Sequence, residues 1–224
     1  MNMRLTFRTA CVSILCAGAA LMAGEPQDIA FVAAYDGSEQ RYVLILPEPF
    51  DPAQSHDLLI CLHGHGSDRW QFARDDRGEA RAARDTAAQH RMILVLPDYR
   101  AKTSWMGPAA EADVVQIIHD LERQHRIGGV VLAGGSMGAT GALTFTALHP
   151  ELVDGVVALN GHANHIEYSG FQEAIQDSFG GAKEAVPEEY RKRSAEFFAD
   201  RFTMPVGITA GGNDTTVPPG SVLR

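Results

Sequence analysis

The chain has 224 residues, of which 45% are hydrophobic and 21% are charged, and its formal net charge is −9 at pH 7. This length and composition predict one globular domain with a sizeable core. The acidic balance argues against a nucleic-acid-binding protein, and no apolar run reaches the roughly 18 residues that a membrane span needs.

The N-terminal segment, residues 1–23, predicts a secretory signal peptide. Arg4 and Arg8 give it a positive start, and small and aliphatic residues follow until the chain turns polar. This order is typical of such signals, although a buried first helix would also contain an apolar run. We therefore expect a secreted or periplasmic protein. Its mature domain, residues 24–224, keeps Cys61 as its one cysteine and forms no internal disulfide.

The predicted elements alternate between strands and helices after an initial hairpin, whose turn lies at Asp36 and Gly37. In chain order they are strands 28–34, 40–47 and 58–62, helix 76–90, strand 92–96, helix 109–125, strand 129–133, helix 137–148, and strands 153–159 and 204–210. Strands separated by single helices predict an α/β fold with a doubly wound, mostly parallel sheet and helices on both faces. In such folds the active site lies beyond the carboxyl ends of the strands.

Residues 134–138, Gly-Gly-Ser-Met-Gly, fit the G-x-S-x-G pattern and make Ser136 the candidate nucleophile. The pattern follows a short strand and opens a helix, as a nucleophile elbow requires. Small residues at Gly134 and Gly138 would let the strand and the helix pack closely, with Ser136 exposed at the positive end of the helix dipole. The alternative is a glycine-rich turn in which the serine only caps the helix.

Residues 63–66, His-Gly-His-Gly, follow a predicted strand and are candidates for the loop that donates hydrogen bonds to the substrate carbonyl oxygen. Acyl transfer passes through an oxyanion that needs two fixed N–H donors. We expect these donors to be the backbone amides of Met137 and His65. The two histidines of this loop would otherwise be polar loop residues or metal ligands, but a metal site needs a third ligand and none has suitable spacing.

Asp214 lies just after the predicted strand 204–210, within residues 211–219, Gly-Gly-Asn-Asp-Thr-Thr-Val-Pro-Pro. A buried carboxylate at that point would orient a catalytic histidine and stabilise its imidazolium. Asp214 is therefore the candidate catalytic acid. The alternative is a turn without a catalytic role, for which an Asn-Asp pair is well suited.

These segments make the chain resemble secreted α/β-hydrolase esterases, in the region shared by polyhydroxybutyrate depolymerase-like, feruloyl esterase-like and prolyl oligopeptidase-like domains. The resemblance covers roughly residues 40–224 and rests on the motifs at 63–66, 134–138 and 211–219, with a further similar segment at 105–113. It implies an α/β-hydrolase fold in which the three motifs supply oxyanion donors, nucleophile and acid, with the serine before the aspartate.

The resemblance also implies a catalytic histidine, which these families place after the acid, past one more helix and strand. No histidine lies beyond His165, and the sequence ends at Arg224. We therefore expect it to stop before the last strand and helix, either as a fragment of an active esterase or as a natural truncation with little activity. The alternative is that His162 or His165 is the base. Instead, we expect His162 to contact substrate, together with His63 and Trp105.

Residues 161–203 are predicted to form a cap-like insertion before the strand that leads to the acid. Pro187 followed by two glutamates is a good helix start. Tyr190, Phe197 and Phe198 would then pack over the site and shape substrate choice, unless the insertion is a peripheral pair of helices.

The sequence thus predicts a serine esterase that forms an acyl-enzyme intermediate and needs no cofactor or metal. Its partner would be a small-molecule or polymeric ester, with no nucleic acid and no membrane span, and its oligomeric state stays open. A serine peptidase of the prolyl oligopeptidase type is the second enzyme hypothesis. A non-catalytic binding protein with a hydrolase fold is the hypothesis from another class.

Overall fold

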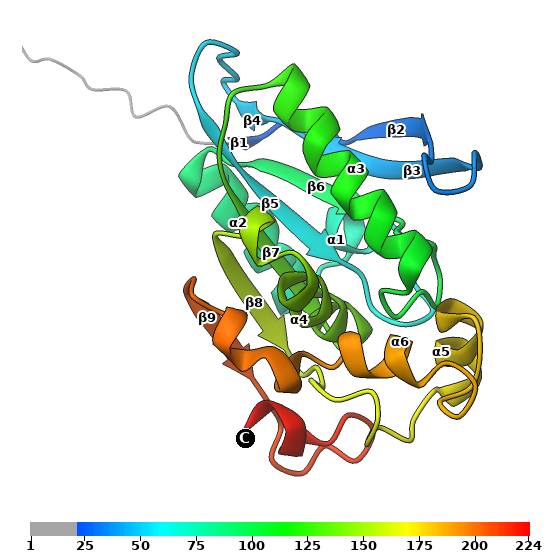
Figure 1. Cartoon of the computed structure of the whole chain (residues 1–224). Coiled ribbons are helices and arrows are strands. Elements are labelled where there is room, and N and C mark those ends of the chain that lie inside the picture. Colours follow the sequence, from blue (N-terminus) through cyan, green and yellow to red (C-terminus); the bar gives the residue numbers. More distant parts are fainter. Residues whose placement is uncertain (1–21) are drawn as a thin grey trace, which may run out of the picture.

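A seven-stranded, mostly parallel sheet forms the centre of the computed structural model, which describes residues 22–224 (Figure 1). In spatial order the strands are β2 (Gln27–Val32), β3 (Glu39–Ile45), β6 (Ile93–Pro97), β5 (His56–Leu62), β7 (Ile127–Gly135), β8 (Gly155–Leu159) and β9 (Val206–Thr209). The first three pair antiparallel, and the pairs from β6 to β9 are parallel. Two short strands, β1 (Met22–Ala23) and β4 (Pro47–Glu48), pair separately. The predicted signal peptide, residues 1–23, lies outside the described residues except for its last two.

Helices cover both faces of the sheet, so the prediction of a doubly wound α/β architecture is confirmed (Figure 1). The helices are α1 (Gln71–Arg74), α2 (Gly78–His90), α3 (Pro108–Gln124), α4 (Met137–Leu148), α5 (Gln172–Phe179) and α6 (Pro187–Lys192). Three short 3-10 helices span Pro150–Leu152, Ala195–Arg201 and Pro219–Val222. Helices α1 and α2 pack on one face of the sheet, and α3 and α4 pack on the other.

Strand β5 shows why the central strands are almost entirely apolar. Leu58, Ile60 and Leu62 point into the core under α3 and α4, whereas Leu59 and Cys61 point into the core under α1 and α2. Successive residues of a strand face opposite sides, so a strand that is covered on both sides buries every side chain. Each fully buried aliphatic side chain contributes about 1.5–3 kcal/mol, and this strand carries the loop 63–66 at its carboxyl end.

Strand β9 forms one edge of the sheet and pairs only with β8. Val206 and Ile208 on β9 are each 41% exposed, although their side chains are on the same face as the buried Val156 of β8. They border a groove of about 380 Å³ whose other walls include Leu143 of α4 and Phe202. Among the described strands, the outer edge of β9 has no partner, and the apolar groove lies beside it.

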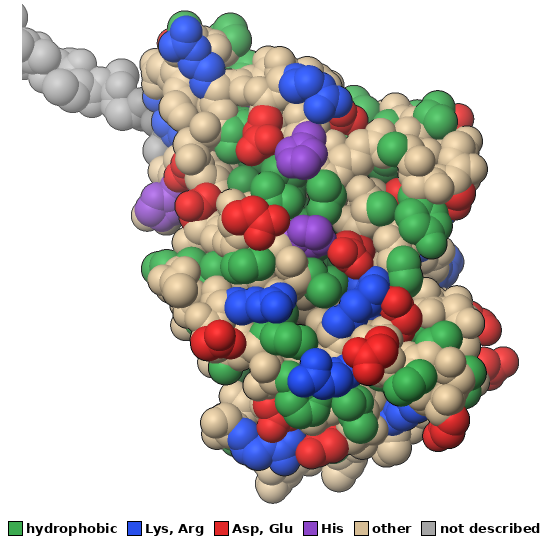
Figure 2. All heavy atoms as spheres, in the orientation of Figure 1, with side chains coloured by type: hydrophobic (Ala, Val, Ile, Leu, Met, Phe, Trp, Pro, Cys, Tyr) green, Lys and Arg blue, Asp and Glu red, His purple; other side chains and the backbone are tan. Residues whose placement is uncertain are grey.

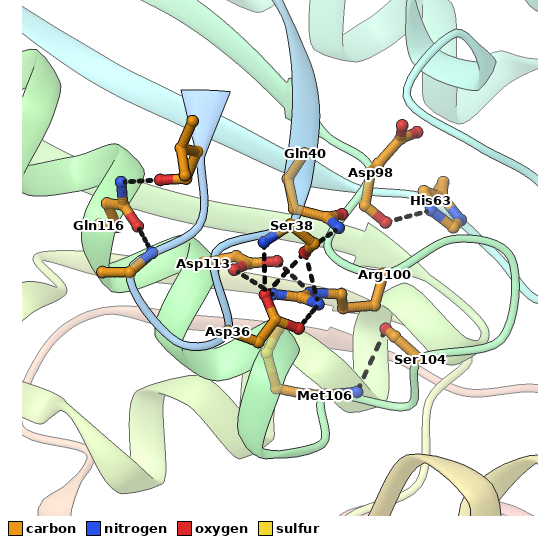
Figure 3. A network of polar contacts seen from close by, with 12 residues as sticks. Asp36, Ser38, Gln40, His63, Asp98, Arg100, Ser104, Met106, Asp113 and Gln116 are labelled. Carbon is orange, nitrogen blue, oxygen red and sulfur yellow. Dashed lines mark hydrogen bonds and ion pairs between the residues drawn. The ribbon is translucent and has the colours of Figure 1, made fainter. Parts of the chain in front are cut away.

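Arg100 links the β2–β3 hairpin to helix α3 through ion pairs with both elements (Figure 3). The Arg100 guanidinium bonds the Asp113 carboxylate of α3 at 2.5 and 2.9 Å and the Asp36 carboxylate of the hairpin turn at 2.6 and 3.3 Å. The Asp113 side chain is only 2% exposed, and a buried carboxylate is tolerated only with such a partner. The pairing also fixes the loop after β6, which carries Tyr99 and Trp105.

Acidic and basic side chains are interspersed with apolar ones on the face seen in Figure 2. Such mixing gives neither the basic field that binds nucleic acid nor a broad apolar patch on this face. Between residues 22 and 224, no helix combines the length and the apolar character needed to cross a bilayer.

Candidate active site

Ser136 occupies the turn between β7 and α4, where the backbone is strained. Its φ of 55° and ψ of −118° lie outside the conformations that a residue with a side chain ordinarily adopts. The Ser136 amide donates to the Leu159 carbonyl on β8 at 2.9 Å, and the Ser136 carbonyl accepts from the Thr140 amide at 3.1 Å. The neighbouring strand and the first turn of α4 therefore hold the strained serine in place.

Two glycines permit this turn because they let α4 begin against the ends of two strands. A Cβ atom on Gly138 would overlap the carbonyl group of Leu62 at the end of β5. A Cβ atom on Gly134 would overlap the carbonyl group of Gly138. The spacing in the G-x-S-x-G pattern is thus a packing requirement of this fold, since no side chain fits at either position.

The backbone amides of Met137 and His65 are unpaired next to Ser136. Met137 is the first residue of α4, so its amide has no acceptor one turn earlier in the helix. Among the described residues, neither amide donates a backbone hydrogen bond. Met137 directly follows Ser136, and His65 borders the same cavity as Ser136. Two backbone donors without an acceptor in residues 22–224 thus belong to residues at or next to Ser136 and its cavity, as the sequence prediction of an oxyanion site requires.

The cavity that Ser136 borders has a volume of about 510 Å³, within the range of ligand sites. His65 forms one wall, and Phe171 of the insertion forms another. Arg77 and Glu79, at the start of α2, add charged groups to the rim. Asp75 bonds the Arg77 guanidinium at 2.5 Å, so this arginine is already paired.

His63 is buried and supports the loop of residues 63–66 instead of bordering the cavity. Its ring nitrogens lie 2.9 Å from the Gly64 carbonyl oxygen and 3.0 Å from the Asp98 carbonyl oxygen (Figure 3). The Tyr99 hydroxyl donates to the His63 carbonyl at 2.5 Å. Burial lowers the pKa of His63, and the hydrogen bonds to the Gly64 and Asp98 carbonyl oxygens oppose that shift. The His63 side chain, which was expected to contact substrate, therefore packs beneath the loop of residues 63–66 and supports it.

Asp214 lies beyond β9 but is half-buried, where the sequence predicted a buried carboxylate. Its Oδ1 accepts from the amides of Thr216 at 2.9 Å and Val217 at 2.8 Å. The Tyr168 hydroxyl donates to the Thr216 carbonyl at 3.0 Å, which ties this loop to the segment after β8. Within the described chain, Oδ2 of Asp214 forms no hydrogen bond, so it could accept one from a histidine. The free oxygen fits a catalytic acid, and the two amide bonds also fit a plain turn.

His162 and Trp105 lie in an aromatic cluster beside the cavity and do not border it. Both are buried, at 2% and 0% exposure. The His162 ring stacks on Tyr168 with 4.0 Å between ring centroids and meets the His165 ring at 4.6 Å. Burial and, to a smaller extent, the nearby charge of Lys183 lower the pKa of His162 to about 3. Two substrate contacts expected from the sequence are thus core residues here.

His165 is fully buried, and its neighbours do not include Ser136. Burial lowers its pKa, and the charges of His162 and Arg193 add to this effect. In the described part of the chain, no histidine forms a hydrogen bond with Ser136 or Asp214. Neither His162 nor His165 is therefore arranged as a base for Ser136.

The family profile described as alpha/beta hydrolase fold matches residues 57–189, more than half of the chain. The chain belongs to the alpha/beta hydrolase fold family. The match spans the oxyanion loop, the elbow at Ser136 and helix α4, which are the parts that bring the candidate site together. A search of curated proteins gave no match to this α/β hydrolase.

Solved structures that share the fold include esterases and peptidases. A candidate dipeptidyl aminopeptidase IV from Bacteroides ovatus superposes with a TM-score of 0.72 at 18% identity, covering 92% of this chain and 30% of that one. A thermostable esterase gives 0.63 at 20% identity, with coverages of 88% and 49%. A ferulic acid esterase from Anaeromyces mucronatus gives 0.61 at 19% identity, with coverages of 96% and 83%. This chain thus spans less than half of the first two proteins, and such low identities show the shared fold alone.

Phe171 is an aromatic residue at the Ser136 cavity of this α/β hydrolase that the sequence did not reveal. It lies in the insertion with a φ of 50°, is 39% exposed and borders the Ser136 cavity. Of the aromatic residues expected to cover the site, Tyr190 is buried against Phe179, and Phe197 is exposed away from the cavity. The insertion packs mainly along α4 and the groove beside β9.

Replacing Gly138 with alanine tests the packing of the elbow. Gly138→Ala should lower the free energy of unfolding by at least about 2 kcal/mol, because its Cβ overlaps the Leu62 carbonyl group. Gly78→Ala is the matched control, since its Cβ meets no atom within 4 Å and alanine favours the start of α2. Urea denaturation measures both changes. Equal stability of the two variants would contradict the packing requirement.

Replacing His162 tests its burial as a neutral ring. The folded-state pKa is about 3 and the usual value is 6.5, so as the pH falls below about 6.5 the unfolded chain binds a proton that the folded chain does not. Stability should therefore fall with acidification, by on the order of 2 kcal/mol from this group between pH 7.5 and 5. His162→Phe should flatten this dependence in urea denaturation, and the exposed His119→Gln should not. An unchanged pH slope in His162→Phe would show that the ring titrates normally.

Proposed function

We propose that this α/β hydrolase is a serine esterase that cleaves carboxylic esters through an acyl-enzyme intermediate on Ser136. One observation carries the proposal: a serine in a strained strand-to-helix turn shares its surroundings with two residues, Met137 and His65, whose backbone amides have no acceptor within residues 22–224. Strain of this kind persists where it serves function, and unpaired donors beside a nucleophile are costly unless an anion uses them. A turn that only caps a helix would also leave the Met137 amide without an acceptor, but it explains neither the strain at Ser136 nor the free His65 amide at the same cavity.

The proposed reaction begins with attack of Ser136 Oγ on the ester carbonyl carbon. The carbonyl oxygen becomes an oxyanion, which accepts hydrogen bonds from the amides of Met137 and His65. Helix α4 adds the positive end of its dipole at the same point. The proposed base takes the Ser136 Oγ proton during the attack. Collapse of the tetrahedral intermediate breaks the ester C–O bond, the alcohol leaves with that proton, and the acyl-serine is then hydrolysed by water in the same two stages.

The proposal assigns Asp214 as the acid and a histidine outside the described residues as the base. Asp214 Oδ2 is free to accept a hydrogen bond from an imidazole N–H. The exposed apolar residues of β9 and the groove beside them support the packing of further chain that would bring such a histidine. Without that group we expect only residual turnover from the oxyanion donors and substrate binding.

The substrate class is proposed as a small-molecule or polymeric ester, because the cavity of about 510 Å³ is open at its charged rim. Several structural neighbours are named as esterases, which supports the choice of ester over other acyl compounds. A secreted or periplasmic location is likewise proposed, on the sequence pattern of residues 1–23.

A serine peptidase is the second candidate, because a neighbour named as a candidate dipeptidyl aminopeptidase IV gives a TM-score of 0.72. The present chain spans 30% of that protein, so the likeness extends to the hydrolase scaffold and not to the rest of that protein. Comparing hydrolysis of an aryl ester with that of the matching anilide separates the two enzyme hypotheses. A non-catalytic binding protein would cleave neither compound.

Fluorophosphonate labelling tests the nucleophile. We expect covalent labelling at Ser136, detected by mass spectrometry, because the phosphonyl oxygen can use the same two amides as a carbonyl oxygen. Ser136→Ala should abolish the label. Ser67→Ala should retain it, since Ser67 borders the same cavity without an elbow. Absence of labelling in this chain and in one that extends past Arg224 would contradict the esterase proposal.

A further inference from the structure

The His65 side chain forms a wall of the Ser136 cavity and is held there by two aromatic residues. The Trp105 indole nitrogen lies 3.2 Å from His65 Nδ1. The Phe171 ring packs on the imidazole with 4.3 Å between centroids and contacts Trp105 at 5.4 Å. Trp105 is fully buried, so its position is fixed by the core and not by solvent.

The hydrogen bond from Trp105 determines which nitrogen of His65 carries the proton. An indole N–H can only donate, so His65 Nδ1 must accept. A neutral imidazole has one N–H, which must therefore be on Nε2. Partial burial lowers the pKa of His65, which also favours the neutral ring at pH 7.

In this arrangement the proton is on the opposite ring nitrogen from the one that carries it in a catalytic base. In a serine triad, a carboxylate accepts from Nδ1–H and leaves Nε2 free to take the serine proton. In this chain Nδ1 accepts from Trp105, so Nε2 holds a proton and can only donate. Among the described residues, nothing accepts a hydrogen bond from Nε2 of His65, while the ring borders the cavity that contains Ser136.

We propose that the imidazole of His65 is a neutral hydrogen-bond donor to the ester substrate, held in the Nε2–H tautomer by Trp105. This inference rests on the proposed function and assigns a side-chain role beyond the backbone amide of the same residue. The donor binds the oxygen on which negative charge develops, and it keeps its proton throughout the reaction. Trp105 acts through His65 and is a positioning residue.

The tautomer can be measured without any turnover. Two-dimensional ¹⁵N–¹H NMR of the imidazole rings, at pH 7, distinguishes a protonated from an unprotonated ring nitrogen, and His65→Gln assigns the signals by their loss. We expect His65 to show a protonated Nε2 and an unprotonated Nδ1. Trp105→Phe should return the ring to a mixture of tautomers, whereas Trp70→Phe should leave it unchanged. A protonated Nδ1 in the unsubstituted chain would overturn the proposal.

Kinetics on an aryl ester, in a chain that extends past Arg224 and carries the proposed histidine base, tests the contact with substrate. His65→Ala keeps the backbone amide and removes the imidazole, so kcat should fall about 100-fold with little change in KM. His65→Gln should recover part of the loss because its side-chain amide can donate, and the exposed His119→Gln should match the unsubstituted chain. A kcat within twofold in His65→Ala would overturn the proposed contact. Absence of turnover in every variant would contradict the esterase proposal, while the NMR measurement still decides the tautomer.

Discussion

The close approach of helix α4 to the end of strand β5, at Gly138, is the contact on which the rest of the site depends. A side chain at this position would overlap the Leu62 carbonyl group, so only glycine lets the helix begin so near the strand. The approach brings the turn at Ser136 and the loop that begins at His63 into one place, although they are more than 70 residues apart in the chain. It also points the start of α4, with its unpaired amides, toward the cavity.

Several residues with positive φ angles lie in the loops around the candidate site. Positive φ angles occur at Ser136, at Asn160 after β8, at Phe171 in the insertion, and at Trp105 and Met106 before α3. The surrounding core holds these conformations, because Trp105 and Met106 are fully buried. The buried residues of these segments support the loop that carries His65 and the turn that carries Ser136, and under the proposed function a preformed site of this kind would lower the reorganisation needed during catalysis.

The order of the strands, their burial on both faces and the elbow at Ser136 could be predicted because each leaves a local pattern. Apolar runs of five residues, a helix with one apolar stripe and a glycine-flanked serine are read directly from neighbouring residues. The directions of the loop side chains could not be predicted in this way. Trp105 and His162 were expected to contact substrate, but positive φ angles at Trp105 and Asn160 belong to loops that direct both rings into the core.

The position of Phe171 at the cavity and the partial exposure of Asp214 could not be predicted for a related reason. Phe171 reaches the cavity from an irregular segment, where no periodicity indicates which side chain points inward. The burial of Asp214 depends on which segments pack against β9. The sequence of residues 211–219 does not indicate which segments these are. The tautomer of His65 is likewise a property of its contact with Trp105, 40 residues along the chain.

The crystal structure of the chain after reaction with a fluorophosphonate would test the central claim most directly. The account predicts a phosphonyl group bonded to Ser136 Oγ, with its charged oxygen about 3 Å from the amide nitrogens of Met137 and His65. An adduct whose oxygen faces solvent, or an adduct on a different residue, would contradict the assignment of this turn as an acyl-transfer site.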